Sequence, residues 1–397
     1  MQIVIVGGGY AGLSCALRLA RKTGGRAQIT LINGREQFVE RIRLHEQAAG
    51  TAPRALSLHS LVRGTGVQLA LGWVEHIDLR NKTLQVGERT LTWDRLVLAL
   101  GSDSDRGSVE GVRDHAYTLS ADRLPALSST LRSLAEQAGR VVVVGGGLTG
   151  IEAASELAES HPGLQVSLLT RGELAPEVSA TARHHVRTVL TALGVQIQAH
   201  TEVLRVEPTR VLTQVREIAC DLCVWTAGFV APALARDAGL SVNRAGQVWV
   251  DDRLRAREHP DVFVIGDLAK LQGERGEALP MGCKLALPMA QYLADSLART
   301  LDTGDEAAPF SYRPPLYCVS LGRREALIQT LPITAPNARF FGGWLAVRIK
   351  EWICRGTLLV LRWERLHAAF SAMLRGRSQP TLPKTGAAER ATDRLHV

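Results

Sequence analysis

Residues 3–12 of the chain read Ile-Val-Ile-Val-Gly-Gly-Gly-Tyr-Ala-Gly, and residues 141–150 read Val-Val-Val-Val-Gly-Gly-Gly-Leu-Thr-Gly. Each stretch is a short apolar run followed by the pattern G-x-G-x-x-G and by residues that favour a helix. One such match is weak evidence, because a glycine-rich turn that binds no ligand can have the same sequence pattern. Two matches, each between an apparent strand and an apparent helix, predict two dinucleotide-binding sites on one chain.

The glycines have separate tasks in this motif. The first permits a tight turn, the second lets the backbone approach a pyrophosphate, and the third lets the helix pack on its strand. The N–H groups and the dipole at the start of each helix then bind the anion. The expected binding glycines are Gly7, Gly9 and Gly12 in the first turn and Gly145, Gly147 and Gly150 in the second.

The pattern therefore predicts an α/β protein with two Rossmann-like dinucleotide-binding domains. A chain that binds two dinucleotides is most simply a relay, in which a nicotinamide gives hydride to a flavin and the flavin passes electrons on. The 397 residues are enough for two or three domains, and a hydrophobic content of 46% is ordinary for a globular protein.

The chain carries a net charge of +8, mostly from arginine. No zinc-ligand spacing, RNA-binding signature or basic–aromatic stripe supports nucleic acid as a partner. Two bound dinucleotides would use part of this charge, and no metal is expected. The chain starts directly in a strand at Gln2, without a signal peptide or a run of about 20 apolar residues. We therefore expect a cytoplasmic protein with reduced thiols.

Periodicity predicts the order of the elements along the chain. A β-α-β unit covers 2–33, strands cover 67–100, and a second β-α-β unit begins at Arg140. Further expected segments are a helix over 171–193, a strand over 218–225, a helix over 284–300, strands over 311–333 and an amphipathic helix over 341–375. Cys220 and Cys223 fall in the strand over 218–225, on opposite faces, which favours buried thiols over a redox or metal pair.

Several motifs occur together in one order. They are the first glycine turn, Leu98-Ala99-Leu100-Gly101-Ser102, the second turn followed by Glu152 and Glu156, and His259-Pro260-Asp261-Val262-Phe263-Val264-Ile265-Gly266-Asp267. Over about residues 1–330 this arrangement resembles the two-dinucleotide flavoproteins. It is most similar in kind to type II NADH dehydrogenases and apoptosis-inducing-factor-like oxidoreductases. The resemblance implies a glutathione-reductase-like FAD/NAD(P) fold with a C-terminal cap.

The resemblance also implies a domain order. An FAD-binding domain is expected over 1–115 and again over 249–310, with an NAD(P)H-binding domain inserted over 116–248. Residues 311–375 would form a C-terminal cap, an interface or a membrane-contact region, and 376–397 a disordered tail.

For FAD, the resemblance implies binding by the first turn, Gly101 and Asp267, with the Asp267 carboxylate accepting hydrogen bonds from the ribityl chain. Capping of the following helix is the alternative role of Asp267. The acid that usually binds the adenosine ribose is replaced by Asn33, which can still form a hydrogen bond, and Glu36 is a second candidate.

For the nicotinamide cofactor, the corresponding acid is replaced by Thr170, followed by Arg171. An acid here repels a 2′-phosphate, whereas threonine and arginine accept one, so this position favours NADPH. In the alternative, Glu173 binds the ribose of NADH and Arg171 is a solvated surface residue.

Three residues are candidates for chemistry beside the flavin. Glu152 lies where the resemblance places a glutamate near the nicotinamide, to position the donor or relay a proton. Arg43 and His45 are expected near the flavin, to stabilise its reduced anion or to protonate an acceptor. In the alternatives, Glu152 interacts with the helix dipole and His45 is a structural histidine.

The acceptor is expected to be a quinone or a quinone-like molecule. Residues 38–47 contain no cysteine, so a dithiol relay is not expected. Ala290-Gln291 matches the start of the quinone-lining motif of type II NADH dehydrogenases, but Asp295 and Ser296 stand near the place of its second glutamine. The alternatives are a tailoring oxidoreductase that acts on a specific small molecule, thiol chemistry at Cys283, or a redox-sensing protein with poor turnover.

The segment 341–375 interleaves tryptophan with arginine and lysine, a pattern of helices that lie in a membrane interface. The resemblance implies the same role, which would make the protein peripheral on the inner face of a membrane. Packing on its own FAD domain, or in a homodimer, is the alternative.

Overall fold

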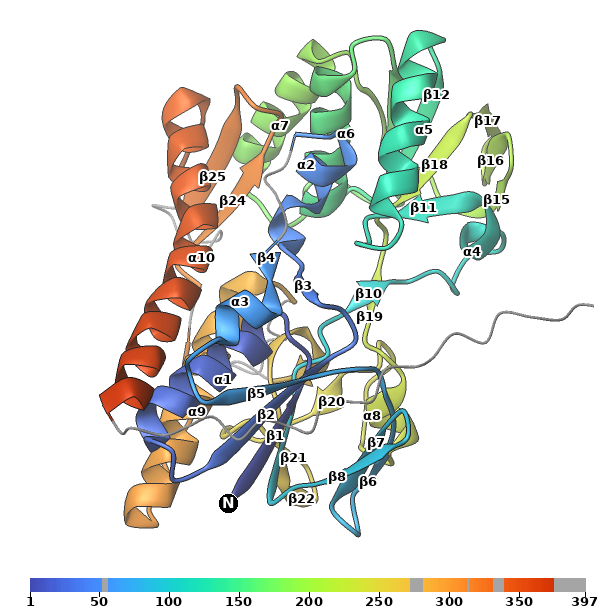
Figure 1. Ribbon diagram of the computed structural model, residues 1–397. Coiled ribbons are helices and arrows are strands. Elements are labelled where there is room, and N and C mark those ends of the chain that lie inside the picture. Colours follow the sequence, from blue (N-terminus) through green and yellow to red (C-terminus); the bar gives the residue numbers. More distant parts are fainter. Residues whose placement is uncertain (52–55, 272–280, 313, 331–338, 375–397) are drawn as a thin grey trace, which may run out of the picture.

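Two parallel sheets, one above the other in Figure 1, organise the chain. The computed structural model describes residues 1–51, 56–271, 281–312, 314–330 and 339–374. Over these residues the chain is a mixed α/β protein with Rossmann-like parallel sheets, as the sequence predicts.

The first sheet has six strands, in the order β21-β22-β9-β1-β2-β5. All neighbours run parallel except β21 and β22. Its strands are β1 Gln2–Val6, β2 Gln28–Asn33, β5 Val67–Leu71, β9 Arg95–Leu98, β21 Arg255–Ala256 and β22 His259–Val264. Segments far apart in sequence thus share one sheet, because β22 pairs with β9.

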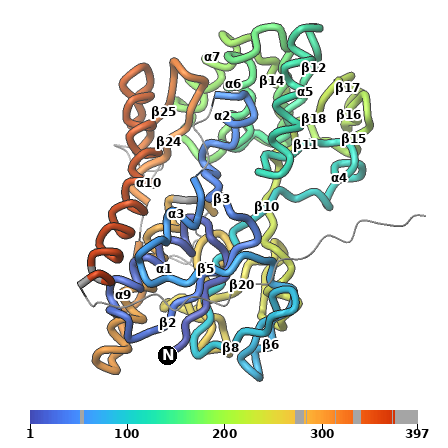
Figure 2. The backbone as a smooth tube through the Cα atoms, viewed as in Figure 1, coloured from blue at the N-terminus to red at the C-terminus, as the bar shows by residue number. Residues whose placement is uncertain are grey.

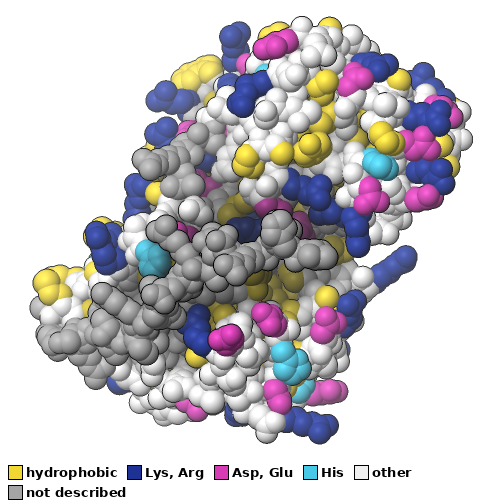
Figure 3. All heavy atoms as spheres, turned by 45° about the vertical axis from the view of Figure 1, so that its right-hand side comes forward, with side chains coloured by type: hydrophobic (Ala, Val, Ile, Leu, Met, Phe, Trp, Pro, Cys, Tyr) yellow, Lys and Arg dark blue, Asp and Glu magenta, His cyan; other side chains and the backbone are white. Residues whose placement is uncertain are grey.

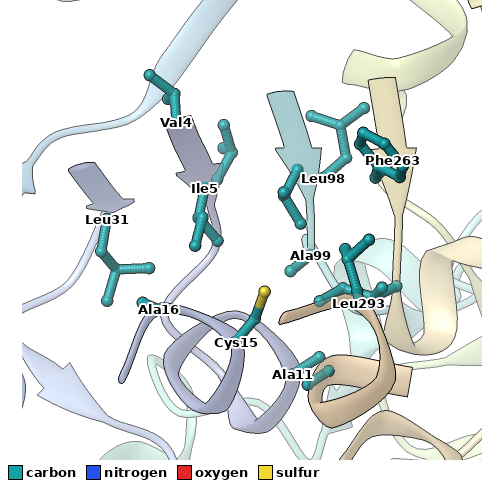
Figure 4. Close-up of a cluster of buried hydrophobic side chains, with 14 of the residues drawn as sticks. Val4, Ile5, Ala11, Cys15, Ala16, Leu31, Leu98, Ala99, Phe263 and Leu293 are labelled. Atoms are coloured by element: carbon teal, nitrogen blue, oxygen red, sulfur yellow. The ribbon is translucent and has the colours of Figure 1, made fainter. Parts of the chain in front are cut away.

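Helices α1 (Tyr10–Thr23) and α9 (Cys283–Thr303) pack together beside this sheet. Figure 4 shows Ala11, Cys15 and Ala16 of α1 against the strand residues Ile5, Leu31 and Leu98, with Leu293 of α9 beside them. All of these side chains are buried. Small residues on α1 let the helix approach the strands closely, which sets its N-terminus at the end of β1.

The second sheet has five parallel strands, in the order β11-β18-β12-β13-β14. They are β11 Ala116–Thr118, β12 Arg140–Val144, β13 Gln165–Leu169, β14 Gln196–Gln198 and β18 Leu222–Trp225. Helices α5 (Leu124–Glu136), α6 (Leu148–Ser160) and α7 (Ala180–Ala192) share a buried apolar cluster with these strands.

The remaining elements are short. The strands are β3 Gln37–Phe38, β4 Leu56–Ser57, β6 Val74–Asp78, β7 Thr83–Val86, β8 Arg89–Thr92, β10 Asp103–Ser104, β15 Val203–Glu207, β16 Arg210–Thr213, β17 Glu217–Ala219, β19 Phe229–Val230, β20 Val248–Trp249, β23 Ala269–Lys270, β24 Leu316–Ser320, β25 Ala326–Thr330 and β26 Phe340–Phe341. The helices are η1 Arg41–Arg43, α2 Leu44–Ala48, α3 Leu58–Val62, α4 Val112–His115, α8 Leu234–Asp237 and η2 Gly266–Leu268.

Helix α10 (Gly343–Leu374) lies along one side of the molecule, beside α1 at one end and β24 and β25 at the other (Figures 1 and 2). Its Glu364 side chain, 2% exposed, accepts hydrogen bonds from Arg18 at 2.6 Å and from Arg21 at 3.0 Å, both on α1. These buried ion pairs fasten the C-terminal helix to the first β-α-β unit.

Two predictions about elements are wrong. The helix expected over 171–193 is only α7, Ala180–Ala192, because the preceding loop folds back on the second glycine turn through the hydrogen bond from Ala175 N to Gly146 O. The strand expected over 218–225 is two strands, β17 and β18, in different sheets. Asp221 lies between them, and its side chain forms an ion pair with Arg140. The predicted tail over 376–397 lies outside the described residues.

Within the described residues, no helix is both long and apolar enough to cross a bilayer. On the face drawn in Figure 3, arginine and lysine side chains are interspersed with acidic ones over much of the surface. No single-sign patch dominates the described part of this face.

Candidate functional site

The first glycine turn leaves open space where a phosphate would lie. Gly7 has a φ of +111°, and a Cβ on it would lie 2.3 Å from the carbonyl oxygen of Ala99. A Cβ on Gly12 would lie 1.8 Å from the oxygen of Gly7, whereas a Cβ on Gly9 would meet nothing within 4 Å. No side chain caps α1 at Gly9. An uncapped helix start beneath open space fits a pyrophosphate.

The second turn repeats this geometry at the start of α6. Gly145 has a φ of +129°, and a Cβ on it would lie 2.5 Å from Thr226 Oγ1. A Cβ on Gly150 would lie 1.9 Å from the oxygen of Gly145, and no side chain caps α6 at Gly147. Both turns thus fit a dinucleotide on steric grounds.

Asn33 and Thr170 occupy matching places beside the two turns. A Cβ on Gly8 would lie 3.0 Å from Asn33 Cγ, and one on Gly146 would lie 2.3 Å from Thr170 Oγ1. Asn33 holds its turn directly, since its Oδ1 accepts a hydrogen bond from Gly8 N at 2.8 Å. Its Nδ2 donates to the carbonyl of Arg35 at 2.7 Å. Its expected ribose contact stays a prediction.

The end of β13 carries an accessible arginine. Arg171 is 82% exposed, with its nearest carboxylate, Glu202, at 3.8 Å. The other candidate, Glu173, is already paired with His200 at 3.2 Å and with Arg183 at 3.6 Å. An incoming ribose would therefore compete with Arg183 and His200 for Glu173, whereas Arg171 is accessible to a phosphate.

Asp267 follows β22 and is hydrogen-bonded to two neighbours. Its Oδ2 accepts from Ser102 Oγ at 2.7 Å, and its Oδ1 accepts from Gly282 N at 2.7 Å. Gly101, with a φ of +72°, precedes Ser102, and Arg41 donates to the Ser102 carbonyl. Arg41 was missed in the sequence, where Arg43 was favoured. No local signal distinguishes the two, because only the fold brings Arg41 to Ser102, in the segment that follows β9.

Arg43, His45 and Glu152 are brought together by α10. Arg43 is 5% exposed and forms ion pairs with Glu46 and with Glu351 of α10, each at 2.9 Å. His45 is 4% exposed, with its Nδ1 3.9 Å from Glu152 Oε2. Lys350 of α10 donates to Glu152 Oε1, which also accepts from Ser320 N at 3.1 Å.

Lys350 is a second residue that the sequence did not reveal. It lies among arginines that point outward, yet it is 9% exposed. Burial opposes its charge, but the Glu152 carboxylate raises the pKa of Lys350 overall. Burial would likewise raise the pKa of Glu152, yet Lys350 and His45 hold it below its usual value. The pair is therefore ionised.

Burial lowers the pKa of His45 to about 4, although Glu152 opposes this change. The ring is therefore neutral near pH 7. Its Nε2 is buried without a hydrogen-bond partner among the described residues, and the neutral ring lacks the extra proton of an imidazolium. Its expected role in protonating an acceptor stays a prediction.

A second group of charges surrounds this cluster. Arg323, in the β24–β25 hairpin, binds Glu156 of α6 at 2.6 Å and approaches Glu46 of α2 at 3.4 Å. A cavity of about 30 Å³, lined in part by Glu46, Arg323, Lys350 and Glu351, lies beside it. It has room for a water molecule beside these side chains.

These features match one known family. The family described as pyridine nucleotide-disulphide oxidoreductase matches residues 1–290. The chain belongs to this family. It is 28% identical to demethylphylloquinone reductase NdbB of Synechocystis over 84% of this chain and 87% of that protein. It is 24% identical to a type II NADH:quinone oxidoreductase of Staphylococcus haemolyticus over 85% and 92% of the two chains.

Solved structures agree on the fold. NDH2 from Plasmodium falciparum, in complex with NADH, has a TM-score of 0.79 at 15% identity, covering 96% of this chain and 99% of that one. The sulfide:quinone oxidoreductase of Aquifex aeolicus has a TM-score of 0.78 at 18% identity, covering 91% and 92%. The expected resemblance and fold class are thereby confirmed.

The disulphide in the family's description has no counterpart among the cysteine side chains that the structure describes. Cys15, Cys220, Cys223, Cys318 and Cys354 are free thiols. Burial raises the pKa of Cys220 to about 11 and that of Cys223 further, so both are protonated and poorly reactive. The side chain of Cys283 lies outside the described residues.

The expected quinone-lining residues lie on α9. Gln291 is half-buried about one turn after Pro288, which lies inside the continuous helix. Asp295, near the expected second polar position of this family motif, pairs with Arg18 at 2.7 Å. That position therefore has a structural partner, and the role of Gln291 stays a prediction.

Proposed function

We propose that this chain is an FAD-dependent NAD(P)H:quinone oxidoreductase without a dithiol relay. The observation that carries the proposal is the pair of uncapped helix starts at Gly9 and Gly147. Each is flanked by two glycines, Gly7 and Gly12 or Gly145 and Gly150, at which a Cβ would clash with neighbouring atoms. The names of the relatives above, a demethylphylloquinone reductase and type II NADH:quinone oxidoreductases, support a quinone as the acceptor.

The residues present fit both dinucleotides. FAD would be held by the first turn, Asn33, Gly101 and Asp267, and NAD(P)H by the second turn, Thr170 and Arg171. When bound, the flavin accepts hydride from the nicotinamide and passes two electrons to the acceptor. The accessible Arg171 guanidinium and the paired Glu173 carboxylate support NADPH as the better donor.

The chain's own part in the acceptor step is to hold a fixed pair of opposite charges. The Glu152 carboxylate raises the pKa of the buried Lys350 ammonium, so Lys350 keeps its proton, and Lys350 in turn keeps Glu152 ionised. The small cavity lined in part by Lys350 has room for a water molecule. The neutral His45 ring lies 3.9 Å from Glu152, and Arg43 anchors its segment to α10 through Glu351.

Helix α10 supports contact with a membrane, where quinones dissolve. Its large exposed side chains are Trp344, Leu345, Trp352, Leu359, Trp363, Leu366, Phe370 and Met373. Arg348, Arg355 and Arg362 are exposed among them, whereas both acids of the helix, Glu351 and Glu364, form ion pairs on its inner side. An apolar face with only basic charge suits the surface of anionic lipid.

The first experiment is an anaerobic titration of the purified protein with NADPH and with NADH, followed by a quinone. We expect the flavin absorbance to bleach with a donor and to return with a quinone faster than with other two-electron acceptors. A flavin that neither donor bleaches would refute the reductase and favour a sensor. Rapid bleaching with recovery only by some other small molecule would favour a tailoring enzyme.

Membrane contact is tested by flotation with vesicles that contain anionic lipid. We expect Trp352→Glu with Trp363→Glu to abolish flotation. Val215→Glu is the matched control, since Val215 is 75% exposed beside β16 and β17. Unchanged flotation would refute the membrane role, and loss of dimers in the same variant would assign α10 to a homodimer interface.

A further inference from the structure

Glu177 lies beside the second glycine turn, in the loop between β13 and α7. The hydrogen bond from Ala175 N to Gly146 O, at 2.8 Å, fastens this loop to the turn. As a result, a Cβ on Gly147 would lie 3.3 Å from Glu177 Oε1. The carboxylate thus reaches the glycine at which a pyrophosphate would approach the backbone.

One oxygen of this carboxylate has no hydrogen-bond partner among the described residues. Glu177 Oε2 is buried, yet it accepts no hydrogen bond from any residue that the structure describes. A buried carboxylate oxygen without a donor is unfavourable, so native proteins seldom keep one without a reason. Its position beside the turn suggests that the missing donor belongs to a ligand.

Two other segments carry polar groups whose charge acts on Glu177. Burial raises the pKa of Glu177, and the charge of Lys284, on α9, opposes this. Burial also raises the pKa of Tyr317, on β24, and the charge of Glu177 adds to it. The Lys284 ammonium lies 3.5 Å above the Tyr317 ring. The charge of Glu177 is therefore partly offset by Lys284.

A carboxylate repels a pyrophosphate bound beside it, unless the ligand also carries hydrogen-bond donors that the carboxylate can accept from. A dinucleotide brings such donors on both sides of its pyrophosphate, as ribose hydroxyls. The adenosine ribose belongs at the end of β13, where Thr170 lies against Gly146. Glu177 lies against Gly147 instead, one residue further along the turn than the glycine that contacts Thr170.

We propose that Glu177 positions the donor by accepting hydrogen bonds from the hydroxyls of the ribose on the nicotinamide side, with Lys284 offsetting its charge against the pyrophosphate. This inference rests on the proposed binding of NAD(P)H at the second turn. Holding that ribose fixes the direction in which the nicotinamide ring leaves the pyrophosphate.

The test compares two ligands that differ by the ribose in question. ADP-ribose carries the ribose beyond the pyrophosphate, ADP lacks it, and neither transfers hydride. Each is titrated calorimetrically into the oxidised holoprotein. We expect Glu177→Gln to weaken ADP-ribose about tenfold and to leave ADP unchanged. The control, Glu173→Gln, alters a carboxylate on the adenosine side and should change both affinities by the same factor.

Other results would overturn the inference. Equal affinities of wild type and Glu177→Gln for ADP-ribose would do so, and so would a gain in affinity for both ligands, since Glu177 would then act only as a repelling charge. If Glu177→Gln does not fold, Glu177→Asp, one methylene shorter, should show the same selective loss, and its absence would refute the role. Wild type that binds neither ligand would refute the donor site itself.

Discussion

Replacing Lys350 with methionine removes the charge that keeps Glu152 ionised. In the wild type, Glu152 Oε1 accepts hydrogen bonds from Lys350 Nζ and Ser320 N, and the neutral His45 ring lies 3.9 Å from Oε2. Methionine fills similar space without charge. The carboxylate then remains nearly enclosed, with one backbone N–H as its donor.

The size of the effect follows from the contact. Two opposite charges at about 4 Å attract by about 4 kcal/mol where the effective dielectric constant is near 20. Losing Lys350 removes an attraction of this size and leaves burial to raise the pKa of Glu152 above its wild-type position. Glu152 should then take up a proton at a higher pH than in the wild type.

The assay is the rate at which quinone reoxidises the reduced protein, measured from about pH 5.5 to 8.5 by stopped flow. Lys350→Met should gain an ionisation that the wild type lacks in this range. Lys350→Arg keeps the charge and should leave the profile flat. If Lys350→Met is folded, retains FAD and follows the wild-type profile, the ion pair has no part in the acceptor step.

Three further predictions concern other parts of the molecule. Gly9→Ala should fold, because its Cβ meets only open space, but it should lose FAD, because that space is where the pyrophosphate would lie. Gly12→Ala should fail to fold, because its Cβ would lie 1.8 Å from a carbonyl oxygen. Thermal melts and flavin content distinguish the two variants. His45 has a pKa of about 4 when folded and about 6.5 when unfolded, so the unfolded chain binds the extra proton. Stability should therefore fall by about 3 kcal/mol from pH 6.5 to 4, and His45→Gln should remove that part of the slope in urea unfolding. Arg171→Glu should lower kcat/KM for NADPH at least tenfold and spare NADH; equal losses for both donors would exclude a contact with the 2′-phosphate.

The glycine turns were readable from sequence because their physics is local. The clash of a Cβ with the oxygen five residues away in the same turn, as at Gly12 and Gly150, depends only on the path of the turn. The apolar strands before them and the packed helices after them follow from short periodicities. For the same reason the order of elements was predicted well, and the failures fell where a long-range contact intervened, as at Asp221.

The charged cluster needed the tertiary structure. Glu152 and Lys350 are 198 residues apart, and Arg43 and Glu351 are 308 apart. The sequence marks Arg43, His45 and Glu152 as candidates by their distance from known motifs. It carries no signal that Lys350 turns inward while Arg348 turns outward, because that depends on where α10 crosses the rest of the molecule.

By itself, then, the sequence determined that two dinucleotide turns exist, where they begin and which residues form them. Only the tertiary structure decided which charges meet: Lys350 with Glu152, Arg41 with Ser102, and Glu177 with the second turn. Steric constraints act between residues that are close in the sequence, so a short sequence pattern is enough to predict them. Electrostatic pairing acts between neighbours in space, and the burial that makes it strong exists only after the chain has folded.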